Sequence, residues 1–318
     1  MSVNHILPAT TPSCQKIAVI LPAHNEEKTV AATVQAFQQA LPGCEVVVCD
    51  NASTDQTASI AHKAGARVIH EPLKGKGNAV RRLLAAVNAD IYILADADQT
   101  YDAQSAPAMI ELLEQNHLDM VTGIRQHTES QSYRTGHIWG NALFNRLFGK
   151  LFKTPTQDVF SGYRVFTRRF ASILPIQSSG FEIETEMTAI ASILKISTGE
   201  LPVHYAPRPT GSTSKLRTWS DGFKILKSFF SLFRHFYPAH FYGTVAGLTA
   251  LLSLLLGVPV IIEFMQTGLV PRIPTAILAS SLGMIAFVIF TTGIILEALA
   301  RNRIEQRKLF FLAAGYKE

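Results

Sequence analysis

Residues 91–98, IYILADAD, place a short apolar run directly before two carboxylates, Asp96 and Asp98. The run has the length and composition of a buried strand, and the acidic pair falls where that strand would end. Two carboxylates at a strand end supply hard oxygen ligands of the kind that divalent cations prefer. A solvated acidic turn has the same local pattern, so the neighbouring segments decide between the two interpretations.

The chain around this run alternates between strand-like and helical patterns. Strands are predicted at residues 17–21, 45–49, 67–70, 91–94 and 120–124, and helices at residues 26–40, 54–64, 77–88 and 105–115. This alternation favours an α/β fold, with a mostly parallel sheet covered by helices on both faces. Such sheets bind ligands at the carboxyl ends of their strands. Polar clusters fall there, at residues 22–27, 50–55 and 96–98.

Several classes of nucleotide-binding protein are excluded by these loops. Residues 22–27, PAHNEE, contain no glycine, which excludes a dinucleotide fingerprint and the Gly-rich loop of a sugar-nucleotide pyrophosphorylase. Residues 75–77, Gly-Lys-Gly, are too short for a Walker loop. The net charge of +5 would suit nucleic acid. However, the cations gather beside long apolar runs, where anionic lipids explain them, and we expect no nucleic-acid partner.

Residues 241–262 and 273–296 are long apolar runs without a charged side chain. At about 1.5 Å per residue, each would cross a hydrocarbon core of about 30 Å as a helix. Lys and Arg flank the pair, whereas the turn between the runs holds only Arg272. The positive-inside rule then places both termini and the N-terminal domain in the cytoplasm. Residues 1–15 lack an apolar core, so we expect a tail there and no signal peptide.

Four motifs resemble, in order and spacing, those of the inverting family 2 glycosyltransferases with the GT-A fold: PAHNEE (22–27), CDNASTD (49–55), GKGNAV (75–80) and DAD (96–98). Three later segments, followed by the apolar pair, are similar to the polyprenyl-phosphate branch, which contains dolichyl-phosphate mannose synthase and bacterial undecaprenyl-phosphate glycosyltransferases: DVFSGYRVF (158–166), FEIETEM (181–187) and RPTGSTSKL (208–216). The resemblance implies a Rossmann-like GT-A domain with a C-terminal transmembrane hairpin.

The resemblance also implies roles for individual residues on the donor side. Residues lining the nucleotide pocket would be Pro22, Ala23, Asn25, Glu27 and Asp50, the last meeting the base, with Lys76, Gly77 and Asp96 near the diphosphate. Asp96 and Asp98 would hold Mg²⁺ or Mn²⁺, with Gln99 beside them, and Asp55 would support the loop. Asn51 stands where many relatives carry a second acidic residue. The nucleotide therefore stays open, with a UDP-linked hexose or N-acetylhexosamine favoured over GDP-mannose.

A lipid phosphate acceptor needs cationic and hydroxyl donors, and Arg suits bidentate phosphate binding. The candidates for this acceptor phosphate site are Arg164, Arg208, Ser212, Ser214 and Lys215. The last four form a loop just before a segment that would lie at the membrane, where a lipid head group would arrive. A flexible surface loop is the alternative interpretation.

The expected reaction is a single displacement with inversion at the anomeric carbon. The phosphate nucleophile is already ionised near neutral pH, so no strong base is required, and catalysis rests on positioning and charge stabilisation. The candidate catalytic residues are Asp98, Asp158 and Arg164. Resemblance alone nominates Asp158, as a base or as a group that orients the acceptor. Of Glu182 and Glu184, which face differently on one helix, at most one is expected to contact the sugar.

Two alternatives have distinct requirements. A processive polysaccharide synthase of the same fold has more spans and a Gln-x-x-Arg-Trp motif, and neither tryptophan here follows an arginine. An inactive membrane scaffold would not need to keep the acidic pair or the Arg/Ser/Lys loop.

The expected organisation is that of an integral protein of a bacterial or archaeal plasma membrane, in which glycines and alanines in the spans would permit homo-oligomers. Its parts are a tail (1–15), the GT-A catalytic domain (16–217), an amphipathic juxtamembrane helix (218–237), two transmembrane helices (241–297) and a basic cytoplasmic tail (298–318). Residues 137–152 are amphipathic as well, which suits either the membrane interface or ordinary core packing.

Overall fold

A computed structural model describes residues 15–127, 156–174, 182–207 and 233–315, together with residues 146, 148–149, 151–152, 176, 178, 180 and 230–231. The chain divides into two compact units. Met1–Leu216 and Phe310–Glu318 form the first, the α/β unit, and Arg217–Leu309 forms the second, the helical unit.

The described part of the α/β unit contains one seven-stranded sheet, in the order β3-β2-β1-β4-β6-β5-β7. The strands are β1 (Ile17–Ala23), β2 (Glu45–Asp50), β3 (Arg67–His70), β4 (Ile91–Leu94), β5 (Met120–His127), β6 (Arg164–Thr167) and β7 (Thr198–Tyr205). All pairings are parallel except those of β6, which runs antiparallel to β4 and to β5. The predicted mostly parallel α/β sheet is therefore confirmed.

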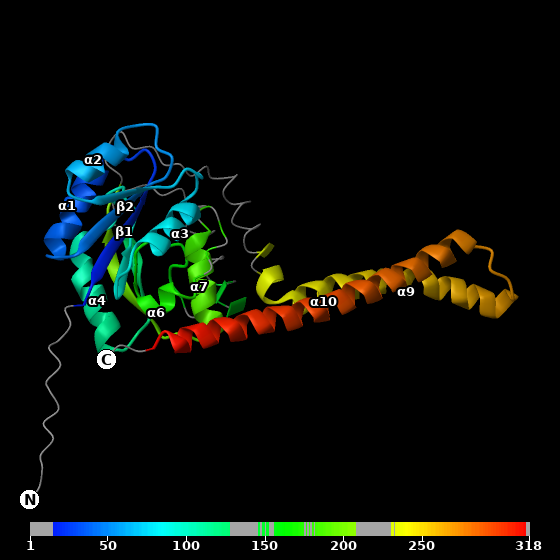
Figure 1. Ribbon diagram of the computed structural model, residues 1–318. Coiled ribbons are helices and arrows are strands. Elements are labelled where there is room, and N and C mark those ends of the chain that lie inside the picture. Colours follow the sequence, from blue (N-terminus) through cyan, green and yellow to red (C-terminus); the bar gives the residue numbers. More distant parts are fainter. Residues whose placement is uncertain are drawn as a thin grey trace, which may run out of the picture. The chain divides into compact units, whose positions relative to one another are not determined.

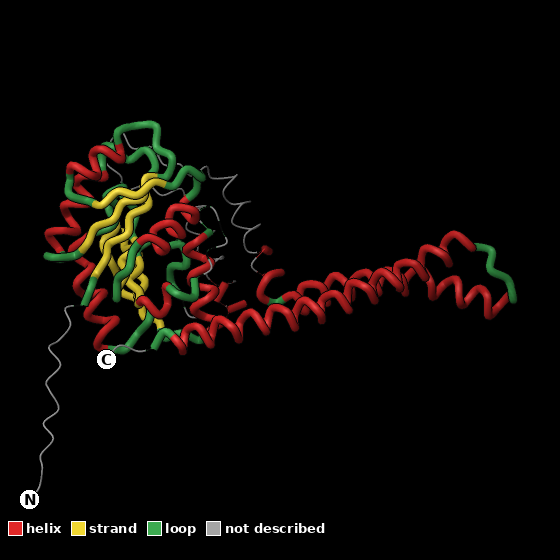
Figure 2. The backbone as a smooth tube through the Cα atoms, viewed as in Figure 1, coloured by secondary structure: helices red, strands yellow, loops and turns green. Residues whose placement is uncertain are grey.

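Helices cover both faces of this sheet, as Figures 1 and 2 show. They are α1 (Val30–Ala40), α2 (Thr57–Lys63), α3 (Lys76–Ala86), the 3₁₀ turn η1 (Ala103–Ser105), α4 (Ala106–Gln115), α6 (Arg168–Ala171) and α7 (Ile183–Leu194). Val19 and Leu21 of β1 belong to a core cluster with Phe37 of α1 and Met109 of α4. The alternate residues of β1 are fully buried too, because α3 lies on the other face. Burial on both faces explains why the central strands are continuous apolar runs.

The order of the strands creates a switch point between β1 and β4. From β1 the chain continues to β2 and β3 on one side and then returns to β4 on the other side of β1. Beyond the carboxyl ends of two such strands the connecting loops diverge, and open α/β sheets bind their ligands in that crevice. The loop after β1 and the acidic pair after β4 both begin there.

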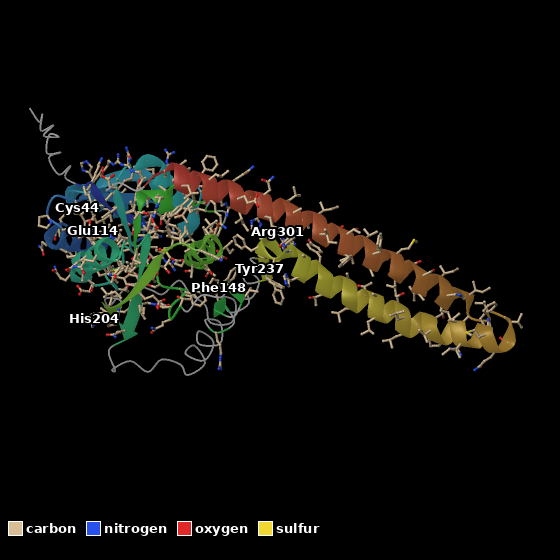
Figure 3. All side chains as sticks on the ribbon, turned by 90° about the horizontal axis from the view of Figure 1, so that it is seen from below. Cys44, Glu114, Phe148, His204, Tyr237 and Arg301 are labelled. Carbon is tan, nitrogen blue, oxygen red and sulfur yellow. The ribbon has the colours of Figure 1, made fainter. Side chains whose placement is uncertain are left out.

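Two long antiparallel helices, α9 (Pro238–Thr267) and α10 (Ile273–Ala313), make up most of the described helical unit (Figure 1). Each contains an 18-residue window of high mean hydropathy, 2.5 in α9 and 2.2 in α10, and each is long and apolar enough to cross a membrane. Large apolar side chains such as Leu248, Leu255 and Phe287 are more than half exposed, and Figure 3 shows side chains projecting along both helices. The pair has the properties expected of a transmembrane hairpin.

Small residues bring α9 and α10 close together. The Ser253 hydroxyl donates to the carbonyl oxygen of Ala279 over 2.7 Å. At Gly293, an added Cβ would come within 2.8 Å of the Cβ of Tyr242, so only glycine permits this approach. Small side chains at helix contacts are typical of membrane helices, whose association depends on close packing and hydrogen bonds.

The structure describes parts of three other segments for which the sequence made a prediction. Helix α10 continues to Ala313, so most of the predicted basic tail is helical. The predicted helix at 218–237 lies mostly outside the described residues. Phe148 and Phe152, within 137–152, are buried with ring centroids 4.4 Å apart, which favours core packing for these two side chains.

Candidate active site

Hydrogen bonds connect the loop after β1 to the loop after β2. Asn25 adopts a positive φ of 53°, its backbone N–H donates to Ser53 Oγ over 3.0 Å, and its side-chain oxygen accepts from the backbone N–H of Thr54 over 2.8 Å. The His24 ring nitrogen Nδ1 lies 2.8 Å from the carbonyl oxygen of Asn51. These polar contacts explain why α1 begins later than its helical pattern predicted.

Asp55 and Glu27 add further hydrogen bonds between the loops after β1 and β2. Asp55 accepts from the backbone N–H of Glu27 over 3.2 Å and from the N–H and hydroxyl of Thr57 over 3.0 and 2.5 Å, while Glu27 accepts from the N–H of Gln56 over 3.2 Å. Burial opposes ionisation of Asp55, but the hydrogen bonds from Thr57 and Glu27 outweigh it and hold its pKa below the ordinary value. Asp55 thus supports the loop, the role its motif implied.

Asp50, the last residue of β2, has an unusual carboxylate. The residue is 9% exposed, and its Oδ2 lies 3.2 Å from His70 Nδ1. Its other oxygen, Oδ1, is buried and has no hydrogen-bond partner among the described residues. Since a buried acceptor without a partner is costly, this oxygen is well suited to accept a hydrogen bond from a ligand.

Asn51 organises the loop that leads to α3. Its side-chain amide donates to the carbonyl oxygens of Glu71 and Leu73 over 3.1 and 2.8 Å, and its side-chain oxygen accepts from the N–H of Gly75 over 2.6 Å. An aspartate could not make the two donations. The departure from the common acidic residue therefore has a structural reason that the motif alone did not reveal.

Lys76, at the start of α3, is the centre of a buried charged cluster. Its Nζ lies 2.5 Å from Asp96 Oδ1 and 2.5 Å from Glu184 Oε1. The Lys76 and Glu184 side chains are only 7% and 4% exposed, whereas that of Asp96 is 27% exposed. Burial lowers the pKa of Lys76, but the carboxylates of Asp96 and Glu184 outweigh it and raise that pKa above its ordinary value. Lys76 is therefore an ammonium ion.

Gly162 lies close to this charged cluster. A Cβ added there would lie 2.9 Å from Lys76 Nζ and 3.1 Å from Asp96 Oδ2, and the Gly162 N–H donates to the Tyr101 hydroxyl over 2.8 Å. The backbone of residues 161–163 thus comes close to the charged groups, and a side chain at 162 would crowd them.

The two carboxylates of the DAD motif differ in their surroundings. Asp98 is 2% exposed and accepts from the N–H and hydroxyl of Thr100 over 3.2 and 2.6 Å. Gln99, between Asp98 and Thr100, has a positive φ of 60°. The described residues contain no group of three or more His, Cys, Asp or Glu able to hold a metal ion. Two carboxylates suit Mg²⁺ or Mn²⁺ when substrate phosphates and water supply the other oxygens, so the residues present fit a cation shared with a ligand.

Asp158 forms a bidentate ion pair with Arg125 of β5. Arg125 Nε and an NH2 donate to the two carboxylate oxygens, each over 2.7 Å, and the guanidinium lies 5.6 Å from the centre of the Tyr205 ring. With both oxygens engaged, Asp158 is placed to orient Arg125 rather than to remove a proton. Arg125 was absent from the residues predicted, and its position at the polar end of an apolar strand was the only signal for it.

Arg164 requires a different assignment from the one expected. The side chain is fully buried, and its Nε and NH2 donate to the carbonyl oxygens of Ser161 and Val159 over 3.1 and 3.0 Å. It therefore braces the segment before β6 and offers no exposed guanidinium to an acceptor phosphate.

The remaining expected residues are placed as follows. Pro22 and Ala23 end β1, and Gly77 is buried in the first turn of α3. Of Glu182 and Glu184, the two glutamates considered as sugar contacts, Glu184 joins the Lys76 cluster. The other acceptor residues proposed from sequence, Arg208, Ser212, Ser214 and Lys215, lie outside the described residues.

The profile of the family described as "Glycosyl transferase family 2" matches residues 18–173. Glycosyltransferase AglJ of Haloferax volcanii is 32% identical over 237 residues, covering 74% of this chain and 77% of AglJ. The chain belongs to glycosyltransferase family 2. Asp50, Lys76 and Asp96 lie within the matched residues, whereas Glu184 lies beyond them.

Two other relatives and one solved structure are also similar to this family 2 glycosyltransferase. Protein RfbJ of Shigella flexneri is 52% identical over 122 residues, covering 38% of this chain and 95% of RfbJ. A dolichyl-phosphate hexose transferase of Haloferax volcanii is 28% identical over 213 residues, covering 67% of this chain and 91% of that protein. The glucosyl-3-phosphoglycerate synthase of Mycobacterium tuberculosis, solved with Mn²⁺, UDP and phosphoglyceric acid, has the same fold, with a TM-score of 0.56, 22% identity and coverage of 69% of this chain and 78% of that one.

Proposed function

We propose that this glycosyltransferase moves a hexose or N-acetylhexosamine from a UDP-sugar to a polyprenyl phosphate at the cytoplasmic face of a membrane, with inversion. The observation that carries the proposal is the charged cluster at the switch point. There Asp96 offers a carboxylate to a cation, and Lys76 offers an ammonium ion to a diphosphate.

The donor side follows from the carboxyl ends of β2 and β4. The unpartnered Oδ1 of Asp50 would accept the imide N–H of a uracil ring. Asp96 and Asp98 would hold Mg²⁺ or Mn²⁺, and Lys76 would pair with the diphosphate. A cation bound there would neutralise charge on the departing nucleotide. A glycosyltransferase of this fold solved with Mn²⁺ and UDP supports the choice.

The acceptor side rests on the two apolar helices and on one relative. Helices long and apolar enough to cross a membrane would hold the enzyme where a lipid-linked acceptor resides. One relative, which aligns over 91% of its own length, is named a dolichyl-phosphate hexose transferase. This name supports a phosphate as the nucleophile. Arg208, Ser212, Ser214 and Lys215 are proposed to bind that phosphate, with Arg125 held in position by Asp158.

The test is transfer of label from a panel of UDP- and GDP-sugars into organic-extractable product. Purified full-length protein is supplied with undecaprenyl or dolichyl phosphate and Mg²⁺ or Mn²⁺, with Asp96→Asn/Asp98→Asn as the control. Label with one UDP-sugar, lost in the control, is the expected result. Label from GDP-sugars alone would overturn the assignment of the nucleotide. Absence of both transfer and nucleotide binding would favour an inactive scaffold.

A further inference from the structure

Lys76 occupies the space that a cation bound to Asp96 Oδ1 would need. Its Nζ is 2.5 Å from Asp96 Oδ1 and equally close to Glu184 Oε1, so those two oxygens lie within twice that distance of one another. Asp96 comes from the loop after β4 and Glu184 from the first turn of α7. Two separate elements thus direct carboxylates at one point, and the ammonium ion fills it.

An ammonium ion and a divalent cation compete for Asp96 Oδ1 in this geometry. A ligated cation lies about 2 Å from its carboxylate oxygen, which would bring it close to Nζ, and like charges at such a distance repel strongly where water is largely excluded. The Lys76 side chain is only 7% exposed, so little water is present to screen the repulsion. A cation that binds Oδ1 therefore displaces the ammonium ion from that oxygen.

Glu184 determines where the ammonium ion remains. Its carboxylate is buried and holds Lys76 independently of Asp96. Lys76 can therefore give up its contact with Asp96 and keep an anionic partner, still at the start of α3, where a helix N-terminus favours a phosphate.

We propose that Lys76 holds the place of the divalent cation in the nucleotide-free site and withdraws from Asp96 when the cation binds. Glu184 is the positioning residue that retains Lys76 beside the diphosphate. The inference rests on the proposed function, in which the donor arrives with a cation. It predicts that the site without nucleotide binds Mn²⁺ weakly because its own lysine competes.

The test measures Mn²⁺ binding to the full-length protein without nucleotide or lipid acceptor, from the electron paramagnetic resonance signal of free Mn²⁺. Lys76→Met leaves Asp96 and Glu184 facing each other, a pair of hard oxygen ligands, and is expected to bind Mn²⁺ at least about tenfold more tightly than the wild type. Lys74→Met is the matched control, since Lys74 is an exposed lysine two residues away. It removes the same charge and should leave affinity near the wild-type value.

Two further variants sharpen the test. Lys76→Arg keeps the positive charge and should bind Mn²⁺ as weakly as the wild type. Lys76→Met/Glu184→Gln removes the second carboxylate and should lose most of the gain. Affinity of Lys76→Met no higher than that of Lys74→Met would overturn the proposal.

A wild-type measurement covers the case in which Lys76→Met does not fold. Acetylation of Lys76 relative to Lys74, read by mass spectrometry, should rise when Mn²⁺ is added at a concentration shown to saturate the site, because Lys76 then keeps only one of its two carboxylate partners. An unchanged ratio would overturn the proposal. Neither readout uses a sugar or a lipid, so failure of glycosyl transfer and failure of this inference are separate outcomes.

Discussion

Arg125 and Asp158 form a two-point contact, with Nε and NH2 of the guanidinium each 2.7 Å from one carboxylate oxygen. The side chains are 20% and 11% exposed, so removal of either partner leaves the other largely buried without its counter-charge. Such pairs act as a unit, and their variants are expected not to add.

Asp158→Asn and Arg125→Gln should each lower turnover about tenfold to hundredfold, because loss of either side chain misplaces the other. The double variant should be little worse than the single ones, with a coupling energy of about 1–3 kcal/mol. The measurement is a double-mutant cycle on the transfer rate. Arg169→Gln breaks a comparable pair with Asp119 and should lower the melting temperature. Its effect on the transfer rate should show no coupling to Arg125→Gln or Asp158→Asn. Additive losses at 125 and 158 would show that the two side chains act independently.

Asn51→Asp should impair the site although many relatives carry an acidic residue there. The aspartate cannot donate to the carbonyl oxygens of Glu71 and Leu73, and Leu73 then keeps only the donation from the Asn78 amide over 3.3 Å. Each lost hydrogen bond costs about 0.5–1.5 kcal/mol. The melting temperature should fall, and the KM for the donor should rise because the loop before Lys76 loosens. Asn88→Asp, at an exposed position, is the matched control. An unchanged KM for Asn51→Asp would contradict a role for Asn51 in shaping this loop.

Gly162→Ala tests the close approach of the backbone to the charged cluster. A methyl group 2.9 Å from Lys76 Nζ and 3.1 Å from Asp96 Oδ2 must displace one of them, and a displacement of this size can cost about a hundredfold in rate. Gly243→Ala, where an added Cβ has nothing within 4 Å, should be neutral. Equal rates for the two variants would place the reacting groups away from Gly162.

Asp55 should make part of the stability dependent on acid. Its pKa is lower in the folded protein than the ordinary 3.8, so its contribution is present above about pH 4 and is lost as the pH falls through the folded value. The difference in melting temperature between the wild type and Asp55→Ala should be largest near neutral pH and should shrink below about pH 4. A difference that stays constant over this range would indicate that the Asp55 carboxylate is not stabilised by the loop.

Strands β1 to β5 were predictable because each has a local strand-like pattern, and the polar loops were predictable because they follow β1, β2 and β4 directly. The edges of the helices were less accurate, since Asn25 and Asp55 pair between loops that are distant in sequence. Strand β7 was not predicted, and neither was β6. Strand β6 begins with Arg164, and its place between β4 and β5 depends on pairing that no local pattern encodes.

The site was predictable only where one motif carries the chemistry. Asp50, Lys76 and Asp96 were identified from their own segments. Arg125 was missed, because its importance comes from Asp158, which lies on another segment. Arg164 was expected at a phosphate because of its chemistry, yet its burial against backbone carbonyl oxygens gives it a bracing role. Composition predicts what a side chain can bind, and tertiary packing decides whether it is exposed to bind it.

The most direct test of the central claim compares three acceptors under one set of conditions. Labelled UDP-sugar and Mn²⁺ are supplied to the purified enzyme with a polyprenyl phosphate, the corresponding polyprenol without phosphate, or no lipid. The account predicts organic-extractable label with the polyprenyl phosphate alone, abolished in Asp96→Asn/Asp98→Asn. Equal labelling of the polyprenol, or label appearing only in water-soluble product, would contradict transfer to a lipid phosphate.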